Sequence, residues 1–162
     1  MRGKNVEQEP KFVILTCNWN AHESLQQAGK QRLHYPAGAR PLKVDCLGQV
    51  SATVILKAFE KGADGVMLVG CSPEECHYEF GSRRASELFA EVRKLSRLLG
   101  FREEQLAFHQ VHAGASEALI DQVRSFAAQL AATRDLPPTR DLSPTPHAPA
   151  ISPPLEGGAG GG

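Results

Sequence analysis

Four cysteines carry the most evident chemistry in the sequence: Cys17, Cys46, Cys71 and Cys76. Four thiolates are the ligand set of a closed zinc site or of an iron–sulfur cluster, and soft thiolates favour these metals over hard cations. The C-x2-C pairs typical of zinc sites do not occur in this sequence, so the spacing favours iron–sulfur over zinc. The alternative is four separate core thiols, because cysteine is among the residue types most often buried.

Several other residues near these cysteines have side chains suited to chemistry. His77 follows Cys76 directly, and it could donate a hydrogen bond to a sulfur or replace a thiolate. Trp19 follows Cys17 and could shield a cluster from water, and His112 could reach the same site. No catalytic carboxylate pair or Ser/His/Asp set is evident, so we expect no catalytic residues. A cysteine nucleophile paired with His77 is a third possibility.

The elements that must position these residues alternate between short apolar strands and longer amphipathic helices. We expect strands at 12–17, 41–46, 65–69 and 106–111, and helices at 22–33, 52–61, 82–99 and 116–130. This alternation predicts an α/β fold, a small doubly wound, flavodoxin-like parallel sheet of strand order 2-1-3-4. Residues expected to face the core from the last three helices are Val54, Ile55, Ala58, Phe59, Leu88, Val92, Leu95, Leu99, Leu119, Ile120, Val123, Phe126 and Leu130.

The cysteines follow the carboxyl ends of these expected strands. Cys17 and Cys46 end the first and second strands, Cys71 lies just past the third, and Cys76 lies in the next loop. In a parallel sheet these ends share one edge, and adjacent strands are about 4.8 Å apart. We therefore expect the four sulfurs to converge at that edge. Tight turns at Gly48, Gly70 and Pro73 could direct backbone N–H groups at the sulfurs.

Length and charge limit the remaining possibilities. The 162 residues suffice for one domain, and 18 basic residues balance 18 acidic ones, which argues against bulk binding to nucleic acid or an anionic membrane. With no long apolar run and no secretory signal at the start, we expect a cytoplasmic protein. Its expected organisation is a flexible N-terminus at 1–10, an iron–sulfur α/β domain at 11–132 and a disordered Pro/Gly-rich tail at 133–162.

Several stretches of the chain resemble a known family, the iron–sulfur delta subunit of methyl-viologen-reducing hydrogenase. The resemblance runs from about 12 to 130. The matching stretches are Cys17-Asn-Trp19, Arg32-Leu-His-Tyr-Pro36, Cys46-Leu-Gly-Gln-Val50, Ile55-Leu-Lys-Ala-Phe-Glu-Lys-Gly-Ala-Asp-Gly-Val66 and Gly70-Cys-Ser-Pro-Glu-Glu-Cys-His-Tyr78.

The resemblance implies an oxidoreductase subunit that carries a 2Fe-2S cluster. Such a subunit relays electrons between a hydrogenase, or another donor, and a heterodisulfide-reductase-like flavin and iron–sulfur complex. It also implies that Cys17, Cys46, Cys71 and Cys76 are the metal and cluster ligands.

Members of the family commonly have further cysteines where this chain has Thr16 and Asn20. Two alternatives therefore stay open. Either the four remaining cysteines hold the cluster, or the chain is a non-redox module of the same fold that holds zinc or no metal.

Overall fold

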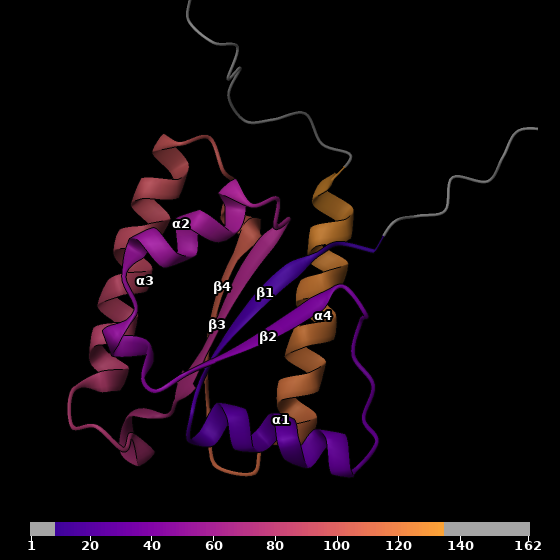
Figure 1. The fold of residues 1–162 in the computed structure, drawn as a ribbon, viewed down its shortest axis with the longest axis vertical. Coiled ribbons are helices and arrows are strands. Elements are labelled where there is room, and N and C mark those ends of the chain that lie inside the picture. The colour runs from indigo at the N-terminus through magenta and orange to yellow at the C-terminus, as the bar shows by residue number, and fades with distance from the viewer. Residues whose placement is uncertain (1–8, 135–162) are drawn as a thin grey trace, which may run out of the picture.

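The computed structural model describes residues 9–134 and shows a parallel sheet between two pairs of helices (Figure 1). The main elements are β1 (Phe12–Cys17), α1 (Asn20–Lys30), β2 (Ala39–Val44), α2 (Ala52–Glu60), β3 (Gly65–Cys71), α3 (Gly81–Leu98), β4 (Leu106–Val111) and α4 (Ser116–Arg134). Short 3-10 helices occupy η1 (Leu47–Gln49), η2 (Pro73–Glu75) and η3 (Glu103–Gln105). The strand order β2-β1-β3-β4, parallel throughout, confirms the predicted doubly wound α/β fold. Residues 1–8 and 135–162, where we predicted a flexible start and a tail, lie outside the described residues.

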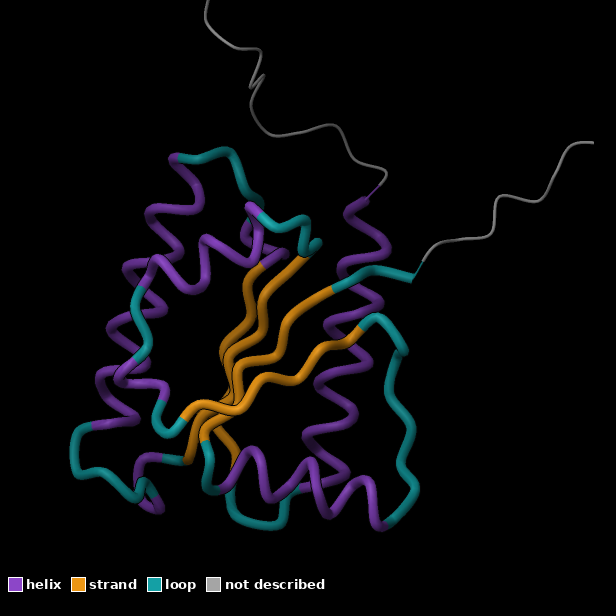
Figure 2. The backbone as a smooth tube through the Cα atoms, in the orientation of Figure 1, coloured by secondary structure: helices purple, strands orange, loops and turns teal. Residues whose placement is uncertain are grey.

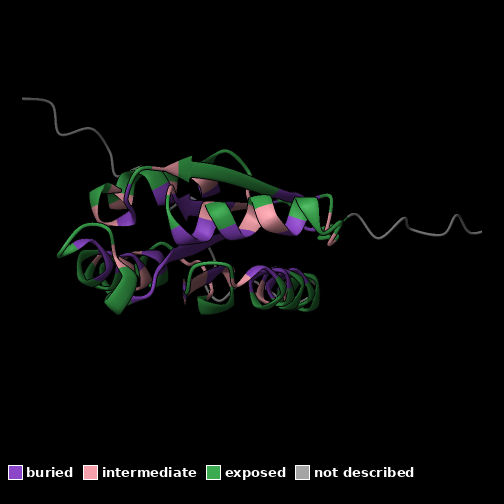
Figure 3. Ribbon diagram, turned by 90° about the horizontal axis from the view of Figure 1, so that it is seen from below, coloured by how far each residue is buried: buried purple, intermediate pink, exposed green. Residues whose placement is uncertain are grey.

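Two hydrophobic clusters join the helices to the two faces of the sheet. On one face α1 and α4 pack against side chains such as Phe12 and Met67, and on the other α2 and α3 pack against residues such as Leu15 and Leu68. All residues of β3 are buried, because this strand is central and covered on both faces. The tube view in Figure 2 shows the strands between these helix pairs, and Figure 3 shows the exposed residues on the outer surfaces. Within residues 9–134, no helix is both long and apolar enough to cross a membrane.

The predicted element boundaries and core residues are mostly close to the structure, with two errors among the core residues. Val54 is 49% exposed, because the buried side of α2 is formed by Ile55 and Phe59, which are one turn apart. Leu99 is 48% exposed, because it caps the end of α3 rather than continuing its buried stripe. The predicted core side of α4 is confirmed, and this helix continues to Arg134, four residues past the expected end.

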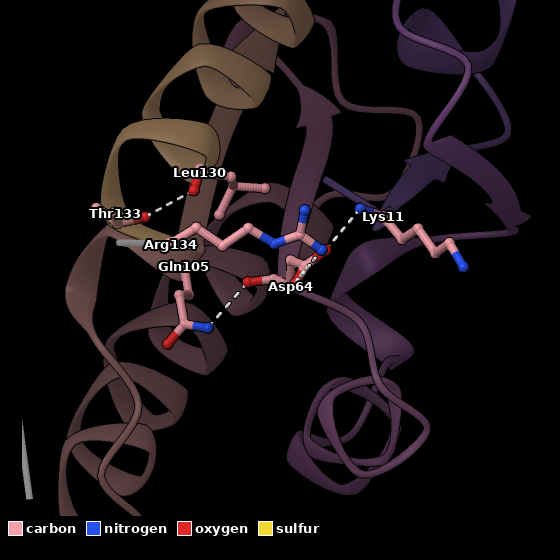
Figure 4. A network of polar contacts seen from close by, with 6 residues as sticks. All are labelled: Lys11, Asp64, Gln105, Leu130, Thr133 and Arg134. Carbon is pink, nitrogen blue, oxygen red and sulfur yellow. Dashed lines mark hydrogen bonds and ion pairs between the residues drawn. The ribbon is translucent and has the colours of Figure 1, made fainter. Parts of the chain in front are cut away.

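Asp64 joins the amino ends of β1 and β3 to η3 and α4 (Figure 4). The backbone N–H of Lys11 donates to Asp64 Oδ2 at 2.7 Å, and the Arg134 guanidinium pairs with the same carboxylate at 3.3 Å. The side chain of Gln105 donates to the Asp64 carbonyl at 2.9 Å. These contacts tie β1, β3, η3 and α4 together at the edge opposite the cysteines.

Candidate metal centre

The four cysteines line one pocket at the carboxyl edge of the sheet. The cavity within this pocket is about 10 Å³. Cys17 and Cys71 are the last residues of the neighbouring strands β1 and β3. Cys46 lies two residues past β2, immediately before η1, and Cys76 immediately follows η2. The four cysteines therefore line one pocket at the expected edge, and their role as ligands stays a prediction.

Cys17 and Cys71 form the first sulfur pair, with their Sγ atoms 3.1 Å apart. Either sulfur can donate in this contact, and the hydrogen bond between them lowers the pKa of Cys17 to about 7 and raises the pKa of Cys71 well above its usual value. Backbone N–H groups of Trp19 and Ala21, at the start of α1, lower the pKa of Cys17 further. A helix start that directs N–H groups at a sulfur stabilises negative charge there.

We call Cys46 and Cys76 the second pair because both sulfurs lie against Gly81. A Cβ atom at Gly81 would lie 2.6 Å from the Cys46 sulfur and 3.2 Å from the Cys76 sulfur. A Cβ atom at Gly48 would lie 2.8 Å from the Gly81 carbonyl oxygen, so both glycines are needed for η1 to approach α3. The Gly48 N–H also donates to the Cys46 sulfur at 3.4 Å, as the sequence predicted for one of its tight turns.

The donor set of this pocket suits a thiolate-bound metal. Three of its cysteines are buried, Cys76 is partly exposed, and all four are free of disulfide bonds. The space beside Gly81 is kept open by the missing Cβ, between two of the sulfurs. Among residues 9–134, no three His, Cys, Asp or Glu side chains are grouped so that they could hold a single ion. Cys17 and Cys71 are thus in direct contact, and Cys46 and Cys76 both lie against Gly81 in the same pocket.

An aromatic pair lies over these sulfurs. The rings of Trp19 and His77 stack with their centroids 3.6 Å apart, and Tyr78 meets the His77 ring edge-on at 5.0 Å. All three residues line the pocket, and Trp19 and Tyr78 are also about 40% exposed (39% and 40%). Trp19 thus lies beside the sulfurs, as its expected shielding role requires. His77 lies beside the sulfurs, but its ring is engaged by Trp19.

Three other residues singled out from the sequence lie outside the pocket lining. The side chain of Thr16 is buried and donates to the Leu42 carbonyl at 3.5 Å, across to β2. Asn20 is buried as well and bonds to Glu75 and to the Val111 carbonyl. His112 lies 3.4 Å from the Glu75 carboxylate, through Nδ1. At positions 16 and 20, where the resemblance led us to expect further cysteines, the side chains are polar and bind neighbouring segments instead.

The sequence interpretation missed two features of this site. Gly81 lies just before the helix expected at 82–99 and was not singled out, although Cys46 and Cys76 both lie against it. The contact between Asn20 and Glu75 was not foreseen, since it joins residues 55 positions apart. A glycine in the first turn of a helix is a weak signal of a close approach. The Asn20 contact has no signal in the sequence.

Comparisons with known proteins agree with this picture. Residues 12–133 match the family model of the methyl-viologen-reducing hydrogenase delta subunit. A vhc iron-sulfur subunit of the F420-non-reducing hydrogenase of Methanococcus voltae is 35% identical over 67% of this chain and 76% of its own. The corresponding iron-sulfur subunit of the F420-non-reducing hydrogenase of Archaeoglobus profundus is 31% identical over 76% of this chain and 90% of its own.

A third relative is a longer protein. This subunit of the ferredoxin:CoB-CoM heterodisulfide reductase of Methanosarcina mazei is 28% identical over 75% of this chain, but the match covers 15% of its own length. A region like this chain therefore also occurs inside a larger polypeptide. The family match spans the whole described sheet with its helices and all four cysteines. The chain belongs to the family of methyl-viologen-reducing hydrogenase delta subunits.

Proposed function

We propose that this protein is an electron-transfer subunit whose four cysteines hold a 2Fe-2S cluster. In this role it passes electrons from a hydrogenase, or another donor, to a heterodisulfide-reductase-like flavin and iron–sulfur subunit. The names of its relatives support this assignment, since they are iron-sulfur subunits of hydrogenases and one subunit of heterodisulfide reductase. The match inside the heterodisulfide reductase polypeptide supports a partner of that type, because there the two parts share one chain.

The observation that carries the proposal is the pairing of the sulfurs in one pocket. A 2Fe-2S cluster takes four cysteines, two on each iron, whereas a structural zinc ion takes four ligands around one point. Cys17 with Cys71, and Cys46 with Cys76, provide two such pairs. Bound there, the cluster would supply one-electron chemistry. The backbone N–H groups at Gly48, Trp19 and Ala21 stabilise negative charge on the sulfurs that hold it.

The aromatic pair of Trp19 and His77 connects the pocket with the protein surface. Trp19 and His77 line the pocket and stack on each other, and Trp19 is partly exposed. Because Trp19 both lines the pocket and is partly exposed, a partner docked on it would contact a ring that borders the cluster site. A protein of this kind needs no substrate-converting residues of its own. The reactions of the substrates take place on the neighbouring subunits.

Purification without oxygen tests the proposal directly. We expect a brown protein whose visible absorbance is bleached by dithionite, with about two iron and about two inorganic sulfide per chain. Each of the four Cys→Ser variants is expected to lose this absorbance. Dithionite-reduced protein is then mixed with a purified heterodisulfide-reductase-like flavin subunit, and reduction of the flavin is followed by its absorbance.

Other outcomes would overturn parts of the proposal. A colourless protein with one zinc per chain would support the non-redox module instead. A brown protein that keeps its colour in the Cys17→Ser variant would remove Cys17 from the ligand set. A loaded protein that leaves the partner's flavin oxidised would contradict the proposed acceptor while leaving the cluster in place.

A further inference from the structure

The buried side chain of Asn20 joins three segments beside the sulfur pocket. Its Nδ2 group donates to Glu75 Oε2 at 2.7 Å and to the Val111 carbonyl at 3.1 Å. The same Glu75 oxygen accepts the backbone N–H of Ala113 at 2.8 Å. Both amide hydrogens of Asn20 are therefore used, one on η2 and one on the end of β4. The start of α1, η2 and the loop after β4 meet at this one residue.

The segment that these bonds hold is the one that carries Cys76. Glu75 is the last residue of η2 and directly precedes Cys76. No residue of η2 is buried, so this segment has little apolar contact of its own to fix it. Its backbone is tied at the start by the Ser72 N–H, which donates to the Val111 carbonyl at 3.0 Å. At the cysteine end, the Glu75 carboxylate makes the side-chain contacts that fix the segment.

We propose that Asn20 and Glu75 form a clasp that holds the Cys76 segment against α1 and thereby positions the Cys76 sulfur beside that of Cys46. This inference deepens the proposed function and rests on it only for the identity of the bound group. Asn20 is a positioning residue, because its side chain lies outside the pocket lining and acts through Glu75. The clasp also gives hydrogen-bond partners to the buried side-chain amide of Asn20 at the start of α1. The first backbone N–H groups of a helix have no partners within the helix, so both kinds of group must find them elsewhere.

The chemistry of the contact requires an amide at this position. Both partners of Nδ2 are acceptors, a carboxylate and a carbonyl, so the side chain must offer two hydrogens. Aspartate has nearly the same shape but would place a second carboxylate against Glu75 and against the Val111 carbonyl. Hydrogen bonds to charged groups contribute more to stability than neutral ones do. Loss of the bond from Asn20 to Glu75 is therefore expected to raise the equilibrium constant for opening of the Cys76 segment about tenfold or more.

The test measures this opening in the reduced apoprotein. Iodoacetamide alkylation is followed at each cysteine by peptide mass spectrometry, and thermal unfolding is recorded in parallel. In Asn20→Asp we expect alkylation of Cys76 to be about tenfold faster, with the rate at Cys46 unchanged. The matched control is Gln26→Glu, which adds the same charge on an exposed position of α1 and should leave all rates unchanged.

A second substitution separates the clasp from a general effect on folding. When Asn20→Asp is combined with Glu75→Gln, the new Gln amide can donate to the new carboxylate at position 20 while its oxygen accepts the Ala113 N–H. We expect this pair to recover part of the slow Cys76 alkylation. Glu75→Gln alone keeps both contacts as neutral hydrogen bonds, so it should speed the alkylation less than Asn20→Asp does. If Asn20→Asp does not fold, Glu75→Ala takes its place, because the Glu75 side chain is 41% exposed.

The outcomes distinguish the clasp from the proposed function. Equal Cys76 rates in wild type and in Asn20→Asp, or an equal rise at Cys46, would overturn the clasp even if the protein binds iron. A selective rise at Cys76 in a protein that never takes up iron would support the clasp and overturn the cluster. Where iron is bound, the clasp also predicts faster loss of visible absorbance to a chelator in Asn20→Asp than in Gln26→Glu.

Discussion

Replacing Gly81 with alanine tests the space between the second pair of sulfurs. The new Cβ atom would lie 2.6 Å from the Cys46 sulfur and 3.2 Å from the Cys76 sulfur. Ordinary contacts between heavy atoms lie at about 3.5–4.0 Å, so the Cys46 sulfur must retreat by roughly 1 Å. Binding sites tolerate displacements of about 0.5 Å. We therefore expect Gly81→Ala to lose most of its capacity to bind iron.

The fold should survive the same substitution. Gly81 begins α3, and its φ angle is not in the left-handed region, so alanine is compatible with the backbone. Overpacking costs about 1–3 kcal/mol, and alanine in place of glycine in a helix recovers up to about 1 kcal/mol. The apoprotein is then destabilised by about 0–3 kcal/mol, which corresponds to a fall of up to about ten degrees in Tm.

The assay compares iron content and visible absorbance per chain after anaerobic reconstitution, together with Tm of the apoprotein. Gly29→Ala is the matched control, because a Cβ at this helical glycine meets nothing within 4 Å. The control should load as wild type does and be equally stable or up to about 1 kcal/mol more stable. Iron loading in Gly81→Ala equal to that of the control would refute the argument that Cys46 and Cys76 act as a pair beside Gly81.

Three further predictions concern the other sulfur pair, the aromatic cover and acid stability. Oxidation of the apoprotein with diamide should first give the disulfide between Cys17 and Cys71, whose sulfurs are 3.1 Å apart, and peptide mapping that shows another first pairing would contradict the geometry. Trp19→Ala should admit water to the cluster and raise its reduction potential by on the order of 40 mV, which is about 1 kcal/mol for one electron. An unchanged potential in a redox titration would show that Trp19 does not shield the site. Burial lowers the pKa of His109 below its ordinary 6.5, so the folded protein resists protonation and loses stability as pH falls below about 6.5. The unfolding temperature of His109→Gln should depend less on pH in that range than that of the wild type does. An equal pH dependence would show that His109 is not the cause of the lost stability in acid.

The sequence alone determined the fold class of the protein and the side chains available for chemistry. Alternating strands and helices with their apolar positions predict the sheet and its order, because such patterns reflect local geometry and burial. Cysteines at the carboxyl ends of successive strands predict a shared edge, because parallel strands end on one side. Errors such as Val54 and Leu99 arose where a helix face extends past the sheet or ends. Periodicity in one helix does not contain that information.

Only the tertiary structure decided how the groups at that edge are paired and held. The pairing of Cys17 with Cys71 depends on the register of β1 and β3, and that of Cys46 with Cys76 depends on how closely η1 approaches Gly81. The bond from Asn20 to Glu75 joins residues 55 positions apart. Differences of a few tenths of an ångström in the distances between such residues are set by packing of the whole domain, because protein interiors are close-packed. The sequence shows which side chains can act as ligands or hydrogen-bond donors, and the packing of the domain decides which groups lie beside them.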